Sequence, residues 1–476
     1  MDLNLNRSAV DIIADLHDRS LSAEALLQAT FERIDALNPT VNAIVGLADR
    51  DDLLSQARAL DAGPVRGPLH GLPLAPKDLV NVAGLRSTQG SPIFADLVPD
   101  SDDVLAANLR AAGAILIGKT NVPEFGLGSH TFNPVYGRTT NPYDPARTCG
   151  GSSGGAGVAL ALGMLALADG SDMMGSLRNP AAWNNVYGFR PTWGRVAPEP
   201  NEDGALHQMS TRGPMARSPQ DLALLLDVLS GPDPMRAEMA APAPLLPGLQ
   251  AFADAGSDLS GMRLGWLGDW GGAFPCEPGI LEVSAEALAV LRGLGAEVDD
   301  LPPPHDFDDL WASWTALRSW QVGAGLRALR QHADQMKDSA QWEMERAEQM
   351  SAIDVHEASA ARARWAWSAH ALFERYDALV LPTTQVWPFP IDLAWPREIN
   401  GVKMDTYHRW MAAMVPVSLL GLPALSVPAG FGEAGPPAGV QIFGPRGSDA
   451  RLLAIGEAYH RPTQWPQRRP PAMVLD

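Results

Sequence analysis

Two serine-bearing glycine loops, separated by one apolar run, constrain this chain more than any other feature of its sequence. The first loop is Gly-Gly-Ser-Ser-Gly-Gly at residues 150–155, and the second contains Gly175 and Ser176. The residues from Ala156 to Ala168 between them are apolar on all sides, which predicts a buried helix. A flexible linker is the alternative interpretation of the first loop, but a linker is not normally followed at once by a buried helix. We therefore expect the helix to hold two serine hydroxyls at a fixed separation.

This stretch resembles the core of the amidase signature family, in which GGSSGG, a helix and GSDxGGSxRxPA follow one another. The second half of that pattern is present here as GSDMMGSLRNPA, residues 170–181. The family also has a lysine in an upstream GxPxxxKD, and residues 71–78 read GLPLAPKD. The likeness extends over nearly the whole chain and is weakest at residues 305–370. It implies an α/β fold in which helices cover both faces of a central mixed β-sheet.

The resemblance also implies a Ser-cisSer-Lys triad that cleaves amide bonds through a covalent acyl-enzyme. Ser176 would be the nucleophile, Lys77 the ultimate base, and Ser152, after a cis peptide bond, the relay between them. A lysine with the ordinary pKa of about 10.4 is protonated at neutral pH, so this role requires burial without a carboxylate partner. The apolar neighbours of Lys77 favour such burial over a surface position. Ser153 is the alternative residue for the relay.

Other residues of the two loops are expected to support the reaction. An oxyanion hole needs backbone N–H groups near the nucleophile, and four residues are candidates: Met173, Met174, Gly175 and Ser176. Family members usually have glycine where this chain has Met174, so the hole requires that Met174 avoid a positive φ. The resemblance implies structural roles for Ser153 and for a pair formed by Asp172 and Arg178. It also places one loop in the acyl pocket: Gly126, Leu127, Gly128 and Ser129.

We expect the 476 residues to form one amidase-signature domain. Its four segments are a helical arm at 1–60, a catalytic core at 61–231, a variable helical cap at 232–375, and C-terminal core strands with a closing helix at 376–476. Strand and helix patterns alternate between residues 69 and 130, which predicts a mixed, largely parallel sheet with helices on both faces. The start of the cap segment, residues 232–258, has the composition of a loop. Core packing is favoured for most of the six tryptophans between residues 305 and 375.

Composition excludes several classes of partner. The net charge of −19 disfavours nucleic acid and anionic membranes, and no apolar run is long enough to span a bilayer. With only Cys149 and Cys276, the chain cannot build a disulfide framework, which favours the cytoplasm. The ten histidines lack metal-site spacing, so no metal or cofactor is expected. The expected partner is a small amide or carbamate substrate, and the sequence leaves homo-oligomerisation open.

Four alternatives compete with a triad amidase. Residues Gly113 to Thr120 match the phosphate-loop pattern GxxxxGK[ST], although their middle reads as a strand rather than a loop. Cys149 is a second candidate nucleophile, without a local histidine partner. The amidase component of a tRNA-dependent amidotransferase has the same signature. The fourth alternative is a catalytically inactive binding module, in which Met174 in place of glycine disrupts the oxyanion hole. Enzymes with this signature cleave primary amides, aryl acylamides, esters and aryl carbamates, which the sequence does not separate.

Overall fold

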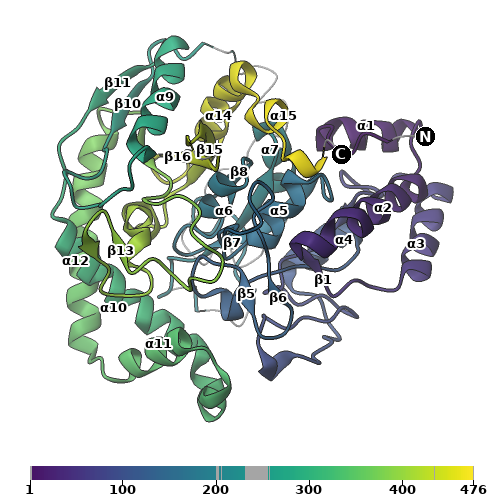
Figure 1. Ribbon diagram of the computed structural model, residues 1–476, viewed down its shortest axis with the longest axis horizontal. Helices are drawn as coiled ribbons and strands as arrows, with labels where there is room; N and C mark the ends of the chain where they lie inside the picture. Colours follow the sequence, from purple (N-terminus) through teal and green to yellow (C-terminus); the bar gives the residue numbers. More distant parts are fainter. Residues whose placement is uncertain are drawn as a thin grey trace.

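A mixed sheet of eight strands runs through the centre of the molecule in the computed structural model (Figure 1). The structure describes residues 3–199, 203–204, 206–230, 256, 258–433 and 435–474. The strand order is β11 (Glu297–Asp300), β10 (Arg263–Trp266), β12 (Ala378–Pro382), β16 (Pro437–Phe443), β15 (Ala424–Phe431), β8 (Tyr187–Arg190), β9 (Thr211–Ala216) and β7 (Leu167–Asp172).

The prediction of a largely parallel sheet is wrong. In the described part of this sheet, β10 pairs in parallel with β11 and β12, while the other five neighbouring pairs are antiparallel. The reason is that β15 and β16 follow one another along the chain and pair directly, and that β8 and β9 do the same. Direct pairing of consecutive strands gives antiparallel neighbours, whereas a helical crossover is needed to make them parallel.

Helices cover both faces of this sheet, and the side chains of β12 show how. Leu379 and Leu381 belong to one apolar core, whereas Ala378 and Val380 belong to the other. Successive strand residues point to opposite faces, so each face has its own core. The first core includes α10 (Phe307–Leu326), α12 (Ala352–Phe373) and α13 (Val415–Leu419); the second includes α5 (Gly154–Ala161), α7 (Pro219–Leu229), α9 (Ile280–Gly293) and α14 (Asp449–Thr463).

The apolar run between the serine loops is not one helix. Helix α5 ends at Ala161, and strand β7 begins at Leu167. Gly163 lies between them with φ of +65°, a left-handed conformation that commonly ends helices. All residues of the run are buried, and a buried helix and a buried strand look alike in an apolar sequence. The second serine loop is therefore held by a strand of the central sheet.

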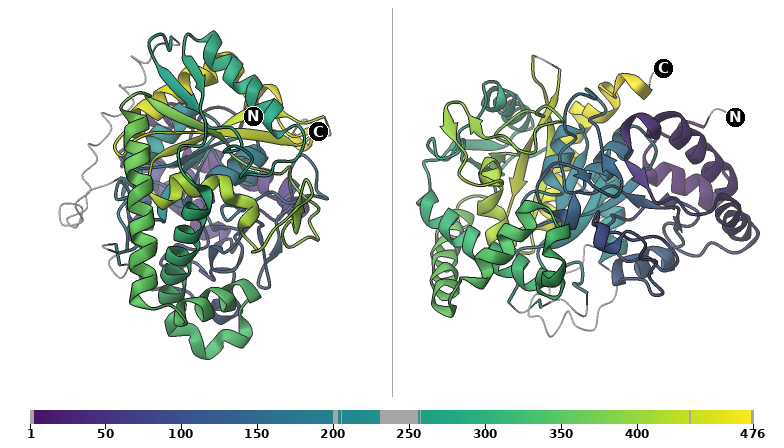
Figure 2. Two further views of the ribbon diagram at one scale, coloured as in Figure 1. Left: turned by 90° about the vertical axis from the view of Figure 1, so that its left-hand side faces the viewer. Right: turned by 60° about the horizontal axis from the view of Figure 1, so that its bottom comes forward.

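The N-terminal arm and the cap lie on opposite flanks of the sheet (Figure 1). The arm consists of α1 (Ala9–Asp18), α2 (Ala23–Val41) and α3 (Arg50–Ala62). The cap consists of α10, a 3₁₀ segment at Arg327–Gln335, α11 (Asp338–Glu348) and α12, and Figure 2 shows these cap helices together at one side. Of its tryptophans, Trp314 and Trp365 are fully buried, while Trp367 is exposed.

The segment expected as a helical cap also contributes strands β10 and β11 to the sheet, with helix α9 between them. The helical cap proper spans residues 307–373. The loop expected at 232–258 lies outside the described residues except for positions 256 and 258. In the described part of the chain, no helix combines the length and apolarity needed to cross a bilayer.

Short strand pairs beside the main sheet position the lysine motif. Strand β2 (Pro73–Leu74) runs parallel to β3 (Ile115–Leu116), and a further parallel bridge joins Lys77 to Thr120. The remaining short elements are β1 (Ile44–Val45), β4 (Lys119–Thr120), α4 (Val104–Ala111), β5 (Phe132–Asn133), β6 (Gly137–Arg138), α6 (Arg178–Trp183), β13 (Glu398–Ile399), β14 (Val402–Lys403) and α15 (Trp465–Arg468).

Candidate active site

The Lys77 ammonium group lies among three serine hydroxyls. Its Nζ is 2.8 Å from Ser152 Oγ, 2.9 Å from Ser153 Oγ and 3.0 Å from Ser171 Oγ. The Lys77 residue is only 1% exposed. Strand β2 and the bridge to Thr120 position the lysine, the first serine loop supplies Ser152 and Ser153, and strand β7 supplies Ser171.

Burial lowers the pKa of Lys77 to about 7, although Asp169 and Asp172 act in the opposite direction. Asp169 also accepts a hydrogen bond from the Lys77 backbone N–H, 3.1 Å from Oδ1. Burial raises the pKa of Asp169 to about 6, so its opposing charge is itself weakened at mildly acidic pH. A substantial fraction of Lys77 is thus neutral at neutral pH, the form that can accept a proton.

The first serine loop contains a cis peptide bond between Gly151 and Ser152. The Gly151 carbonyl accepts a hydrogen bond of 2.5 Å from Ser129 Oγ. Ser152 lines a cavity of about 680 Å³, whereas Ser153 does not line it. Both hydroxyls accept from Lys77, but the Ser153 backbone N–H also donates to the Ser176 carbonyl at 3.2 Å. The two adjacent serines therefore face different surroundings.

The second serine loop places Ser176 at the cavity, where it is 9% exposed. Gly175 has φ of +83°, and a Cβ there would lie 2.6 Å from the Met414 side chain. Met174 is not among the residues with positive φ, so the departure from glycine at that position forces no left-handed methionine.

Backbone N–H groups near Ser176 differ in their hydrogen bonding. The Gly175 N–H donates to Asp172 Oδ1 at 2.9 Å, and the Leu177 N–H donates to Oδ2 at 3.2 Å. Among hydrogen bonds of the described residues, none uses the N–H groups of Met173, Met174 or Ser176. These three N–H groups have no partner among the described residues, whereas the Gly175 N–H is engaged by Asp172.

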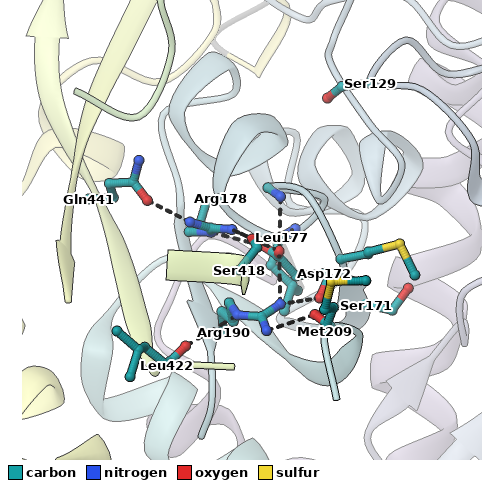
Figure 3. Close-up of polar contacts among 12 residues, drawn as sticks. Ser129, Ser171, Asp172, Leu177, Arg178, Arg190, Met209, Ser418, Leu422 and Gln441 are labelled. Atoms are coloured by element: carbon teal, nitrogen blue, oxygen red, sulfur yellow. Dashed lines mark hydrogen bonds and ion pairs between the residues drawn. The ribbon is translucent and has the colours of Figure 1, made fainter. Parts of the chain in front are cut away.

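A buried ion-pair network fixes the loop that carries Ser176 (Figure 3). Arg178 Nε and Nη2 each lie 2.9 Å from a different oxygen of Asp172. Arg190 donates to the same carboxylate, and all three side chains are fully buried. Burial by itself raises the pKa of Asp172, but the two arginines outweigh it and hold that pKa well below its usual range. Arg178 also reaches Gln441 and Ser418, far along the chain.

The lining of the cavity of about 680 Å³ includes the lysine and three of the serines, namely Lys77, Ser152, Ser171 and Ser176. Of the predicted pocket loop, Gly126, Leu127 and Gly128 line it, while Ser129 lies outside the lining and supports the Gly151 carbonyl. Helix α10 of the cap contributes another part of the wall: Arg318, Gln321, Val322, Ala324, Gly325 and Leu326.

The structure argues against two of the alternatives. A phosphate loop requires an α-helix directly after it, but residues 121–153 contain only a short 3₁₀ turn at Glu124–Gly126 and no α-helix. Lys119 is buried, and its ammonium donates to the Val80 carbonyl. Cys149 is fully buried and outside the cavity lining, and burial raises its pKa to about 12. A thiol in that state is a poor nucleophile. The described residues contain no group of three side chains suited to a metal.

Several residues at this site escaped the sequence analysis. Ser171 and Asp169 both contact Lys77. Ser171 is the serine of the recognised GSD motif and Asp169 lies one residue before that motif, so their shared position in β7 was the available signal. Arg318 and Gln321 reach the cavity from α10, more than 140 residues after Ser176, and no local pattern marks them.

A lysine and three serines gathered below one cavity, beside the central sheet, indicate a serine-based enzyme with an α/β fold. The family model for Amidase matches residues 25–453. The chain therefore belongs to the amidase signature family, whose enzymes are hydrolases acting on carbon–nitrogen bonds.

Individual relatives agree with this assignment. An acylamidase of Rhodococcus erythropolis is 33% identical over 483 residues, covering 97% of each chain. A glutamyl-tRNA(Gln) amidotransferase component of Thermus thermophilus is 35% identical, covering 96% of this chain and 97% of its own. Among solved structures, a bacterial aryl acylamidase of the amidase signature family has a TM-score of 0.88 and 28% identity, covering 98% of both chains.

Proposed function

We propose that this protein hydrolyses amides of small molecules through Ser176, Ser152 and Lys77. The observation that carries the proposal is the contact of 2.8 Å between Lys77 Nζ and Ser152 Oγ, combined with a Lys77 pKa that burial lowers to about 7. A neutral amine in contact with a serine hydroxyl can accept a proton, and a second serine in the same cavity can supply it.

The proposed reaction has two halves. In the first, Ser176 Oγ attacks the carbonyl carbon while its proton passes through Ser152 to Lys77. The N–H groups of Met173, Met174 and Ser176 receive the developing oxyanion. Collapse breaks the C–N bond, and the proton returns through Ser152 to the leaving amine. In the second half, water attacks the acyl carbon while its proton passes through Ser152 to Lys77. Collapse breaks the bond between Ser176 Oγ and the acyl group, and the proton returns through Ser152 to Ser176 Oγ, which releases the acid and restores the enzyme.

The relay step requires that the hydroxyls of Ser152 and Ser176 lie in the same cavity. Ser152 and Ser176 both line the cavity, but among the hydrogen bonds of the described residues none joins their oxygens. A bound substrate that displaces water would bring the two hydroxyls into contact, because catalytic hydrogen bonds are often completed only in the substrate complex.

The substrates that we propose are aryl acylamides and primary amides, with aryl carbamates and esters as further candidates. The acylamidase of Rhodococcus erythropolis supports acylamides first. The experiment compares turnover of an anilide, a primary aryl amide and an aryl carbamate by the wild-type protein and by Ser176→Ala. We expect at least one compound to be cleaved by the wild type and none by the variant. Full activity of Ser176→Ala would overturn the proposal.

A second candidate function is the amidase component of a tRNA-dependent amidotransferase. The 35% identity to the Thermus thermophilus protein favours it. That function predicts glutaminase activity and copurification with partner proteins. Cleavage of anilides by the isolated chain, with no glutaminase activity, would decide for the small-molecule amidase.

A further inference from the structure

Helix α10 places two polar side chains in the cavity wall that the proposed reaction does not use. Arg318 and Gln321 are three residues apart, so they lie on the same face of the helix. Both line the cavity that also contains Ser152 and Ser176.

The Arg318 guanidinium is fixed by cap residues on one side. Its Nε donates to Glu343 Oε1 at 2.8 Å, and its Nη2 donates to the Tyr407 hydroxyl at 2.6 Å. Glu343 is fully buried and also accepts from Tyr407 and Ser319. An arginine held in this way has little freedom, so its remaining N–H groups point in defined directions.

Among the described residues, the other side of the guanidinium meets only a weak acceptor. Arg318 Nη1 lies 3.1 Å from the sulfur of Met173, three residues before Ser176. A thioether is a weak hydrogen-bond acceptor, and Arg318 is 4% exposed. A strong donor that is buried without a full set of acceptors is costly, which favours a ligand oxygen at this place.

Gln321 offers the complementary group. Its side-chain oxygen is buried without a hydrogen-bond partner, and the described residues give its amide no other bond. A buried polar atom in this state is uncommon in folded proteins. Both residues line the cavity, so the pair places a donor and an acceptor side by side in the cavity wall.

Charge at the cavity selects a neutral ligand over an anion. The positive charge of Arg318 is balanced by the negative charge of Glu343, with which it forms an ion pair. The other charged groups of the lining are mainly acidic, namely Asp103, Asp169, Glu199 and Asp203 against Lys77 and Arg212. A neutral group with one acceptor and one donor fits best, and an amide or carbamate has both.

We propose that Arg318 and Gln321 bind a second, non-reacting amide or carbamate group of the substrate, whose carbonyl accepts from Arg318 and whose N–H donates to Gln321. This inference rests on the proposed function for the reacting bond, and narrows the substrates to compounds with two such groups.

The test compares matched substrates with and without the second group. On the acyl side, the pair is the para-nitroanilides of N-acetyl-β-alanine and of hexanoic acid, which have the same chain length. On the amine side, the pair is para-acetamidobenzamide and para-isopropylacetanilide. We expect the amide-bearing member of at least one pair to have a higher kcat/KM by roughly tenfold or more, as for hydrogen bonds to a charged group.

Variants assign that preference to the two side chains. In Arg318→Lys and Gln321→Leu, the ratio of kcat/KM within the pair is expected to fall close to one. Gln321→Leu removes no hydrogen bond of the described structure. It therefore tests the proposal even if the arginine variant does not fold. The exposed Gln349 lies outside the cavity lining, and Gln349→Leu is the control in which the ratio persists. A wild-type ratio near one for both pairs, or an unchanged ratio in Gln321→Leu, would overturn the proposal.

Calorimetry separates this proposal from the proposed reaction. Binding of the same four compounds to Ser176→Ala measures the preference without turnover. Tighter binding of the amide-bearing compounds, lost in the double variant with Gln321→Leu, supports the subsite even if Ser176 is not the nucleophile. Equal binding within both pairs contradicts it even if Ser176 is.

Discussion

Lys77 sets the pH dependence of the proposed reaction. Since its pKa is lowered to about 7, the base form is present above neutrality and lost below it. We expect kcat/KM to rise with pH through about 7 and then to level off. Asp169 raises the pKa of Lys77, so Asp169→Asn should move the rising limb to lower pH. Profiles of kcat/KM against pH for the wild type and the variant measure both effects.

The matched control for this prediction is Asp405→Asn, at an exposed carboxylate. It should leave the rising limb in place. A limb near the ordinary lysine pKa, or a shift to higher pH in Asp169→Asn, would contradict the assignment of Lys77 as the base.

The two adjacent serines can be distinguished by substitution. Both hydroxyls contact Lys77, but only Ser152 lines the cavity. We expect Ser152→Ala to lower kcat by about 10² to 10⁴, the usual loss for a proton-transfer group, and Ser153→Ala to have a smaller effect. Steady-state kinetics on one anilide measure both. A larger loss in Ser153→Ala would transfer the relay role to Ser153.

Short motifs in the sequence identified most of the residues of the proposed reaction. Lys77, Ser152 and Ser176 stand in patterns with fixed internal spacing, and such patterns can be read without knowledge of the fold. Ser171 and Asp169 contact the same lysine, yet their roles depend on the direction of side chains along β7. That direction follows only once the residues are known to form a strand.

The loop before Ser176 depends on its backbone conformation. At Gly175 a side chain would require φ of +83° and would meet Met414 at 2.6 Å. We expect Gly175→Ala to lower kcat/KM by about 10²-fold, because small displacements of reacting groups are costly.

Met174 is buried but has no positive φ. Met174→Ala should therefore lower the free energy of unfolding by about 2–5 kcal/mol. Its effect on kcat/KM, expressed as a free energy, should be smaller.

Kinetics and urea unfolding of these two variants give the comparison. Full activity in Gly175→Ala would show that the left-handed turn is not needed for the reaction. Loss of activity without loss of stability in Met174→Ala would give the Met174 side chain a direct role at the site.

Helix and strand assignments from the sequence succeeded where the pattern was amphipathic and failed where it was uniformly apolar. The sequence predicts helices at residues 279–294 and 449–459, and the observed helices α9 (Ile280–Gly293) and α14 (Asp449–Thr463) lie there. The run from Ala156 to Ala168 was divided by Gly163 into a helix and a strand. Both elements are buried on all sides, so hydrophobicity alone does not separate them.

The Arg178 network joins distant parts of the chain. This arginine links Asp172, before the nucleophile loop, to Ser418 and Gln441 near the C-terminus. Without Arg178, Asp172 keeps its contact with Arg190 but loses two charge-assisted hydrogen bonds, and breaking a buried ion pair costs about 3–5 kcal/mol. We therefore expect Arg178→Met to lower the free energy of unfolding by about that amount.

Urea unfolding measures this change, and Arg330→Met is the control. Arg330 pairs with Glu348 at the surface, and exposed pairs contribute about 0–1 kcal/mol. Equal effects of the two substitutions would show that the Arg178 network does not stabilise the molecule beyond an ordinary surface pair.

The overall architecture was predictable in class but not in strand direction. The resemblance implied a mixed sheet between two helical layers, as observed. Strand direction depends on which strands pair, a long-range property that the alternation of strands and helices does not determine. The contact of Arg318 with Met173 spans 145 residues, and such tertiary contacts of the cap leave no local trace in the sequence.

The most direct test of the proposed reaction is to identify the residue that becomes acylated. An aryl carbamate that releases its phenol quickly and its carbamoyl group slowly would leave an adduct on the enzyme, which peptide mass spectrometry locates. We predict a carbamoyl group on Ser176 in the wild-type protein and none in Ser176→Ala. An adduct on Ser152, Ser153 or Cys149, or one that persists in Ser176→Ala, would contradict the assignment of Ser176 as the nucleophile.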